Sequence, residues 1–329
     1  MVLCSLVKQA IRFHCVALPG ASRADRNRGH RMFDSQRTLA IACAAALLIF
    51  TMPARALVIG AYHILPLPHY YEKTGRVPPG GGDGPMYYYG GSVFSTVRVV
   101  TVIWGNKVNK QTIDEMPIFS ADIVNSTYMD QMAEYDTVHH KGVNGHGSTK
   151  QRILRGSYFG QVQITPKHKG SQITDDDIRR ELTVQIRNGV LPANDLNTLY
   201  MIYFPSNVTI NLDGLISCQD FGAYHFAKKT GGLKANNIFY TVEPECNSGF
   251  DYLTFAASHE FAEATTDNIP TPGSIPDFPQ AWNDDHGHEV GDLCTGFVGA
   301  LTDGTKTYEV TQYYLNSTRA CSMGDYRSP

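Results

Sequence analysis

The chain has 329 residues, with 28 Lys and Arg against 31 Asp and Glu, which gives a formal net charge of −3 at pH 7. No basic run remains beyond residue 57, so nucleic acid is not an expected partner. The length, with 42% hydrophobic residues and no evident internal repeat, suffices for one large domain or two lobes around a substantial core.

The amino-terminal segment has the pattern of an export signal. We interpret residues 1–31 as an upstream extension, with Met32 as the alternative initiator, and residues 32–56 as a signal peptide. An apolar run ends in Ala54-Arg-Ala56, which matches an Ala-x-Ala cleavage site, so Leu57 is the expected first mature residue. The run is too short to span a bilayer, so an uncleaved anchor is the less favoured alternative, and no transmembrane anchor is expected after cleavage. Cleavage would remove 8 basic and 2 acidic residues and leave a net charge of −9.

Cysteine usage agrees with export. After cleavage four cysteines remain, Cys218, Cys246, Cys294 and Cys321, an even number that allows three pairings. We favour Cys218–Cys246 and Cys294–Cys321, because each closes a local loop beside the motif described below. The expected location is extracellular, with the periplasm or a cell wall as alternatives.

The mature chain divides into a short first segment and a longer second segment, and the strands are expected in the second. Residues 57–91 are rich in Pro, Gly and Tyr and predict an irregular arm, while residues 92–329 are expected to form a single mixed α and β domain. Stretches dense in β-branched and apolar residues predict core strands at residues 93–104, 198–204 and 238–242, with strand and turn at 153–165.

The helices are expected between these strands. Residues 113–133 have apolar residues at helical spacing. Thr174, followed by three Asp residues, predicts a capped helix whose apolar face carries Ile178, Leu182 and Ile186. A third helix is expected at about residues 251–267, followed by loops and short strands. Strands that alternate with helices predict an α+β fold, a mixed β-sheet with packed helices.

The third predicted helix carries the most informative motif, His259-Glu260-Phe-Ala-Glu263. It reads HExxE, one residue away from the HExxH of zinc peptidases, in which two ligands lie four residues apart and the intervening Glu acts on the metal-bound water. Positions 259 and 263 differ by about 40° around a helix, so both side chains leave one face. A carboxylate is an acceptable zinc ligand, and an oxygen-rich ligand set also suits Mn²⁺ or Mg²⁺. The alternative is an amphipathic helix with an acidic face.

A catalytic zinc needs a third protein ligand, and a downstream polar segment supplies the candidates. On spacing alone the choice stays open, and a polar surface loop is the alternative. The candidates are Asp284, Asp285, His286, His288, Glu289 and Asp292.

The order of these motifs resembles the EXORDIUM-like (phosphate-induced protein) family. The resemblance is carried by HExxEAxT from His259, then Ala281-Trp282, then Glu289-Val-Gly-Asp292-Leu-Cys294, and then a final Cys321. Tyr88-Tyr-Gly-Gly91 with Val102-Ile-Trp104-Gly105 is similar to the amino-terminal signature of that family.

The resemblance implies a secreted, extracellular or wall-associated protein without a well-defined chemistry. The family's recurring polar positions match His259, Glu260, Glu263, Glu289 and Asp292. The chain departs from the family where Ala223-Tyr224-His225 replaces a Cys-containing turn, and where Thr266-Asp267-Asn268 replaces an Asn-Pro ending. We interpret His225 as a hydrogen-bonded residue rather than a ligand.

We expect a secreted metal-dependent hydrolase, a zinc metallopeptidase with a zincin-like active-site helix and a peptide or protein substrate. His259 and Glu263 would hold the metal with Glu289 or Asp292, and Glu260 would be the general base. Two carboxylate ligands neutralise the dication, so activity should be weaker, or its optimum more alkaline, than in HExxH enzymes.

Two other hypotheses remain. The protein could be a non-enzymatic extracellular protein that binds a cell-wall component, in which the HExxE site is structural. Glu260 and Glu263 could also form a glycosidase pair, although nothing in the sequence marks a sugar cleft.

Overall fold

The computed structural model describes residues 58–59, 62–75, 84–229, 237–271, 275–303 and 306–323. The predicted upstream extension, the signal peptide and Leu57 lie outside these ranges. All described residues belong to the unit Met52–Pro329. Among them, no helix combines the length and the hydrophobicity that crossing a bilayer requires.

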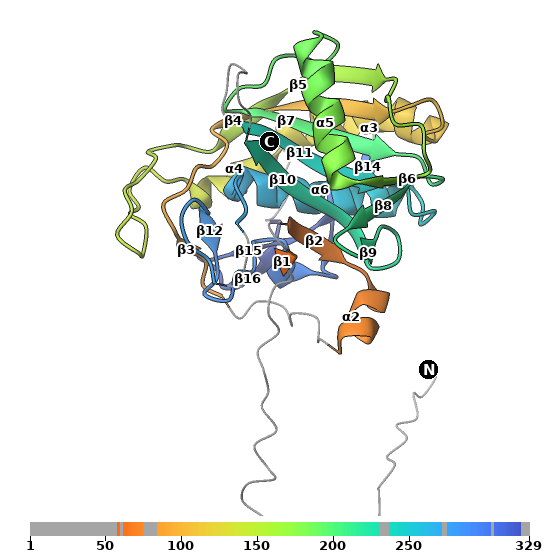
Figure 1. Cartoon of the computed structure of the whole chain (residues 1–329). Helices are drawn as coiled ribbons and strands as arrows, with labels where there is room; N and C mark the ends of the chain where they lie inside the picture. The colour runs from red at the N-terminus through yellow and green to blue at the C-terminus, as the bar shows by residue number, and fades with distance from the viewer. Residues whose placement is uncertain are drawn as a thin grey trace, which may run out of the picture. The chain divides into compact units, whose positions relative to one another are not determined.

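A mixed sheet runs through the middle of the fold (Figure 1). From one edge to the other the order is β1 (Val58–Ile59), β2 (Tyr62–Pro66), β10 (Phe221–Lys229), β11 (Asn237–Pro244), β7 (Thr198–Phe204), β4 (Thr96–Trp104) and β5 (Leu154–Ile164). Neighbouring strands pair in parallel from β11 to β5, whereas β10 pairs antiparallel with both β11 and β2. The predicted strands at 93–104, 198–204 and 238–242 correspond to β4, β7 and β11.

Helices cover both faces of this sheet (Figure 1). Successive residues of the central strands point to opposite faces, so β7 sends Met201 to one core and Ile202 to the other. The core around Met201 packs against α3 (Lys110–Val124), α4 (Thr127–Met132) and α6 (Phe250–Thr266). The core around Ile202 packs against α5 (Asp175–Arg187). The expected α+β fold, a mixed sheet with packed helices, is therefore observed.

The predicted helix at 113–133 is in fact two helices. The first helix begins at Lys110, so Pro117 lies inside it, and it ends at Val124 with Asn125 as its C-cap. Ser126 then has an extended backbone and precedes α4. The chain turns here because Asn and Ser side chains compete for backbone hydrogen bonds: the Ser126 hydroxyl donates to the Ile123 carbonyl.

The segment predicted to be an irregular arm contains regular structure. Strand β2 pairs with β10, and its residues His63, Ile64 and Leu65 are buried. Pro66 and Pro68 obscure this strand in the sequence, yet both lie at or beyond its end, where a missing N–H matters least. The consequence is that residue 63 belongs to the interior of the fold.

Short elements complete the fold, and those from residue 298 onward pack on the same side of the sheet as α6. Both predicted disulfides are present, Cys218–Cys246 and Cys294–Cys321, which fits an extracellular location. The remaining elements are α2 (Pro68–Thr74), β3 (Tyr87–Tyr88), η1 (Ala133–Tyr135), β6 (Gln172–Thr174), β8 (Thr209–Leu212), β9 (Leu215–Ile216), β12 (Trp282–Asn283), η2 (Asp292–Cys294), β13 (Val298–Asp303), β14 (Lys306–Thr311), β15 (Tyr313–Leu315) and β16 (Ala320–Ser322).

Candidate metal centre

Helix α6 presents the HExxE residues inside the protein. The helix spans Phe250–Thr266, close to the predicted 251–267, and nearly all of it is buried. His259 and Glu263 leave the same face, with Nε2 of the imidazole 3.1 Å from Oε1 of the carboxylate. Glu260 is also fully buried. The local geometry expected from the four-residue spacing is therefore present.

The segment around η2 adds two carboxylates to this face. The backbone N–H of Asp292 donates to Glu263 Oε1 at 2.9 Å, and the N–H of Glu289 donates to Asp292 Oδ2 at 3.1 Å. Asp292 Oδ1 lies 3.9 Å from His259 Nε2. Gly291 makes this approach feasible, because a Cβ there would lie 2.8 Å from both His259 Nδ1 and Glu263 Oε1.

His225, on β10, joins the same group. Its Nδ1 makes a hydrogen bond with Glu260 Oε2 at 3.1 Å and lies 3.7 Å from Glu263 Oε2. Its Nε2 lies 3.5 Å from Glu289 Oε1. The hydrogen bond agrees with the sequence interpretation, but that interpretation left His225 outside the site, whereas the structure places it between three of the carboxylates. An ionisable residue between Tyr224 and Phe226 in a buried strand was the available signal.

His63, on β2, was missed altogether. It is paired with His225 across the β2–β10 ladder, and the two ring centroids are 6.0 Å apart. Its Nδ1 lies 2.6 Å from Glu289 Oε2. The sequence offered little to find it, because the strand that holds it is short and lies in a Pro-rich segment.

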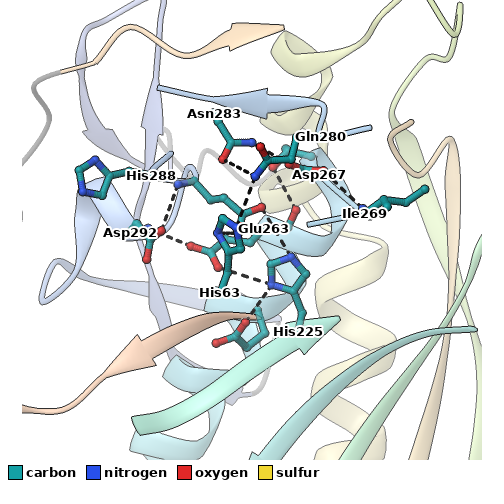
Figure 2. A network of polar contacts seen from close by, with 12 residues as sticks. His63, His225, Glu263, Asp267, Ile269, Gln280, Asn283, His288 and Asp292 are labelled. Atoms are coloured by element: carbon teal, nitrogen blue, oxygen red, sulfur yellow. Dashed lines mark hydrogen bonds and ion pairs between the residues drawn. The ribbon is translucent and has the colours of Figure 1, made fainter. Parts of the chain in front are cut away.

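The structure also selects among the downstream candidates. Asp284 and His288 pair with each other, Oδ2 to Nδ1 at 2.7 Å, and the His288 ring is turned away from the group (Figure 2). The side chains of Asp285 and His286 are 70% and 41% exposed. Glu289 and Asp292 are thus the downstream residues that reach α6.

The three imidazoles and four carboxylates that meet here form a group of seven residues, which we call the His/carboxylate cluster. In Figure 2 the side chains of His63, His225, Glu263 and Asp292 point toward one another. Three groups within the cluster have the spacing of metal ligands. At most 7% of any member is exposed, and with neutral imidazoles its formal charge is −4. The members are His63, His225, His259, Glu260, Glu263, Glu289 and Asp292.

Several ligand-type atoms of the cluster have no aligned hydrogen-bond partner among the described residues. Burying an ionised group without compensation costs several kcal/mol or more, so such atoms call for protons or a cation. In a tetrahedral zinc site with bonds of about 2.0–2.2 Å, neighbouring ligand atoms are about 3.3–3.6 Å apart. The separations of 3.1 Å between His259 Nε2 and Glu263 Oε1 and of 3.5 Å between His225 Nε2 and Glu289 Oε1 are close to this spacing. The cluster atoms without an aligned hydrogen bond are His63 Nδ1, His225 Nε2, both ring nitrogens of His259, Glu260 Oε1, Glu263 Oε2 and both oxygens of Glu289. The residues therefore fit a divalent cation.

The pKa values show that imidazoles and carboxylates of the cluster shift one another in opposite directions. Burial acts to raise the pKa of Glu289, but the nearby His63 and His225 imidazoles outweigh it and lower that pKa to about 2. Burial acts to lower the pKa of His63, yet Glu289 raises it to about 9. Burial and neighbouring carboxylates raise the pKa of Glu263 well above its ordinary value. Metal binding would therefore displace protons from the cluster.

Further buried polar residues lie beside the cluster, among them Asp267, Gln280 and Asn283 (Figure 2). Asn283 Nδ2 donates to Asp267 Oδ2 at 2.6 Å, just beyond the end of α6. Burial, followed by the charge of Glu289, raises the pKa of Asp267 to about 7. Glu243, on β11, is fully buried, and burial followed by the charge of Glu260 raises its pKa well above the ordinary value.

An apolar cavity of about 440 Å³ is lined by residues of β2 and α6, the elements that carry His63 and His259, although no member of the cluster lines it. It is built by the same elements: Leu65 lies two residues after His63 on β2, and Phe255 lies one helical turn before His259, a rise of about 6 Å. Tyr71 also lines it, and its buried hydroxyl has no hydrogen-bond partner among the described residues. Burial, followed by the charge of Asp292, raises the pKa of this tyrosine. We call this space the apolar pocket.

No protein-family model, no curated protein and no solved structure matches this chain.

Proposed function

We propose that the His/carboxylate cluster binds a divalent metal, zinc first among the alternatives, and that the protein is a secreted metal-dependent hydrolase of the peptidase type. One observation carries the proposal: imidazole nitrogens and carboxylate oxygens from β2, β10, α6 and η2 converge in the interior, many without aligned hydrogen bonds. Water cannot screen so much negative charge there, and a dication would neutralise it. The resemblance to the EXORDIUM-like family and the export signal are parts of this proposal.

The residues that would hold the metal follow from these contacts. His259 and Glu263 present adjacent ligand atoms on α6, and His225 and Glu289 present a second pair from β10 and from the segment before η2. His63 is paired with Glu289 and would orient that carboxylate. When bound, the metal would supply a Lewis acid that lowers the pKa of water.

Glu260 remains our candidate for the general base. One of its oxygens, Oε2, is held by His225, whereas Oε1 has no hydrogen-bond partner among the described residues. Burial raises the pKa of Glu260, although the hydrogen bond with His225 opposes this. A carboxylate with a raised pKa is a better proton acceptor at neutral pH, as a general base requires.

The apolar pocket supports a peptide substrate with an apolar side chain. Its lining is aliphatic and aromatic, including Leu65, Tyr252 and Phe255, and it offers no charged partner among the described residues. The backbone of a peptide whose leucine or phenylalanine side chain occupies the pocket would lie beside β2 and α6, the elements that carry His63 and His259. Tyr71, between the pocket and Asp292, would be positioned to donate a hydrogen bond to that backbone.

Burial supports a second candidate function. The ligand atoms are almost inaccessible, and structural metal sites are closed whereas catalytic sites keep an open position. In this alternative the ion stabilises a non-enzymatic extracellular protein that binds a cell-wall component.

Elemental analysis of the purified mature protein, combined with turnover of an unfolded protein, separates these functions. We expect one divalent metal per chain. Glu260→Gln should keep the metal and lose about 10²–10⁴-fold in hydrolysis, because a general base contributes on that order. His259→Ala should lose metal and activity together, whereas His288→Ala, a buried control paired with Asp284, should keep the metal.

Two other outcomes would contradict the metal site or the hydrolase function. Wild-type protein without stoichiometric metal would refute the metal site. Stoichiometric metal with no turnover, in wild type and Glu260→Gln alike, would identify the ion as structural.

A further inference from the structure

A second cavity lies at the carboxyl ends of the parallel strands, and no member of the His/carboxylate cluster lines it. Its volume is about 860 Å³, within the usual range of small-molecule sites. It is lined by the residues at which three parallel strands end, including Trp104 of β4, Ile164 of β5 and Pro205 after β7. We call it the strand-end cavity.

The topology makes this position a favoured one for ligands. From β4 the chain crosses to β5 through α3 and α4 on one face of the sheet. From β5 it returns past β4 to β7 through α5 on the opposite face. The loops after β4 and β5 therefore leave toward opposite faces, and in open parallel sheets ligands bind in the crevice formed at such a switch point.

The lining indicates an anionic ligand. Lys107 and Lys169 both line the strand-end cavity, are exposed, and make no ion pair with a described residue. Among the described residues, none of those that line the cavity is acidic, although acidic residues outnumber basic ones in the whole chain. His168 adds a further nitrogen donor and lies 3.5 Å from Asp177.

A nucleotide is not the expected anion. In doubly wound folds the phosphate lies at the amino end of the helix that follows the first strand. Here that position, at the start of α3, is taken by the carboxylate of Glu245, which accepts hydrogen bonds from the Asn109 N–H and the Thr112 hydroxyl. A second anion beside Glu245 would be repelled.

The other lining groups suit hydroxyl-rich ligands. The cavity combines amides and hydroxyls, Asn106, Thr165, Ser171 and Asn207, with the apolar floor of Trp104. These side chains can donate and accept hydrogen bonds, as sugar hydroxyls require. We propose that the strand-end cavity binds an acidic oligosaccharide, a short chain of uronate sugars, whose carboxylates pair with Lys107 and Lys169.

Calorimetric titration of the mature protein with trigalacturonate tests this inference. Fully methyl-esterified trigalacturonate is the matched neutral ligand, and we expect it to bind at least tenfold more weakly. Lys107→Glu/Lys169→Glu should weaken trigalacturonate binding at least tenfold. Lys141→Glu/Lys150→Glu should change it less than twofold, because these exposed lysines precede β5, whereas the cavity lies at the carboxyl end of that strand.

Three results would overturn the inference: equal binding of the acid and its ester, unchanged binding by Lys107→Glu/Lys169→Glu, or equally tight binding of triaspartate or inorganic phosphate. Thermal unfolding of both double variants checks the fold, which these exposed side chains should not affect. The titration is repeated on metal-stripped protein. Binding that persists there supports the strand-end cavity even if the proposed hydrolase chemistry fails.

Discussion

At the scale of single residues, the His/carboxylate cluster depends on how closely the backbone at residue 291 approaches α6, as well as on the identity of the ligand side chains. Gly291 lies against both His259 and Glu263, so the backbone that leads to Asp292 can donate directly to the Glu263 carboxylate. Any side chain at 291 would have to push these two groups aside. The glycine is therefore as much a part of the site as the charged residues.

Gly291→Ala should lower metal affinity and stability together. Its Cβ would lie 2.8 Å from His259 Nδ1 and from Glu263 Oε1, and overpacking of a buried site costs about 1–3 kcal/mol. Metal content and thermal unfolding measure the two effects. Gly147→Ala is the matched control, since its Cβ would meet nothing within 4 Å. If the two variants behave alike, Gly291 has no role in shaping the cluster.

At the scale of elements, helix α5 shows how local chemistry fixes one layer of the fold. Thr174 accepts a hydrogen bond from the Asp177 N–H, and the Asp177 carboxylate accepts one from the Thr174 N–H, a complete capping box. Burial acts to raise the pKa of Asp177, but the Thr174 N–H and hydroxyl and then Arg180 lower it below its ordinary value. The folded state thus favours the ionised form of the Asp177 carboxyl group more than the unfolded state does.

Removing this cap should destabilise the protein by a predictable amount and with a predictable pH dependence. Thr174→Ala should cost about 1 kcal/mol in the free energy of unfolding at pH 7. The lowered pKa of Asp177 stabilises the fold above the unfolded value of about 3.9, and this contribution is lost as the pH falls through the lower folded value.

The difference between wild type and Asp177→Asn should therefore shrink between pH 5 and pH 2. Urea unfolding across this range measures it. A difference that stays constant with pH would show that the carboxylate charge plays no part.

At the scale of the whole molecule, the two disulfides should contribute similarly to stability but hold different segments in place. Their sequence separations, 28 and 27 residues, are nearly equal, so the chain-entropy model assigns each about 3–4 kcal/mol. Cys294, however, lies two residues after Asp292 and ties η2 to β16, whereas Cys218–Cys246 joins the turn before β10 to the segment after β11.

Removing either disulfide should therefore destabilise the fold to a similar extent, but only one should loosen the metal. Cys294→Ala/Cys321→Ala should lower metal affinity, because η2 carries Asp292 and follows Glu289. Cys218→Ala/Cys246→Ala is the matched control and should keep the affinity of wild type. Denaturation by guanidinium and competition with a chelator measure the two properties. Equal metal loss in both variants would show that the effect is global rather than positional.

The sequence by itself determined what depends on local spacing. The four-residue separation of His259 and Glu263 placed both side chains on one face of a helix, and short loops favoured the two disulfide pairings that are observed. The density of β-branched and apolar residues likewise predicted the central strands, and a capping pattern followed by apolar residues at helical spacing predicted α5. Only the tertiary structure brought His63 and His225 into the site, because they come from strands that are distant in the sequence and adjacent in the sheet. It also selected Glu289 and Asp292 over Asp284 and His288, since which carboxylate reaches α6 depends on how the segment before η2 packs, a long-range property that no local pattern encodes.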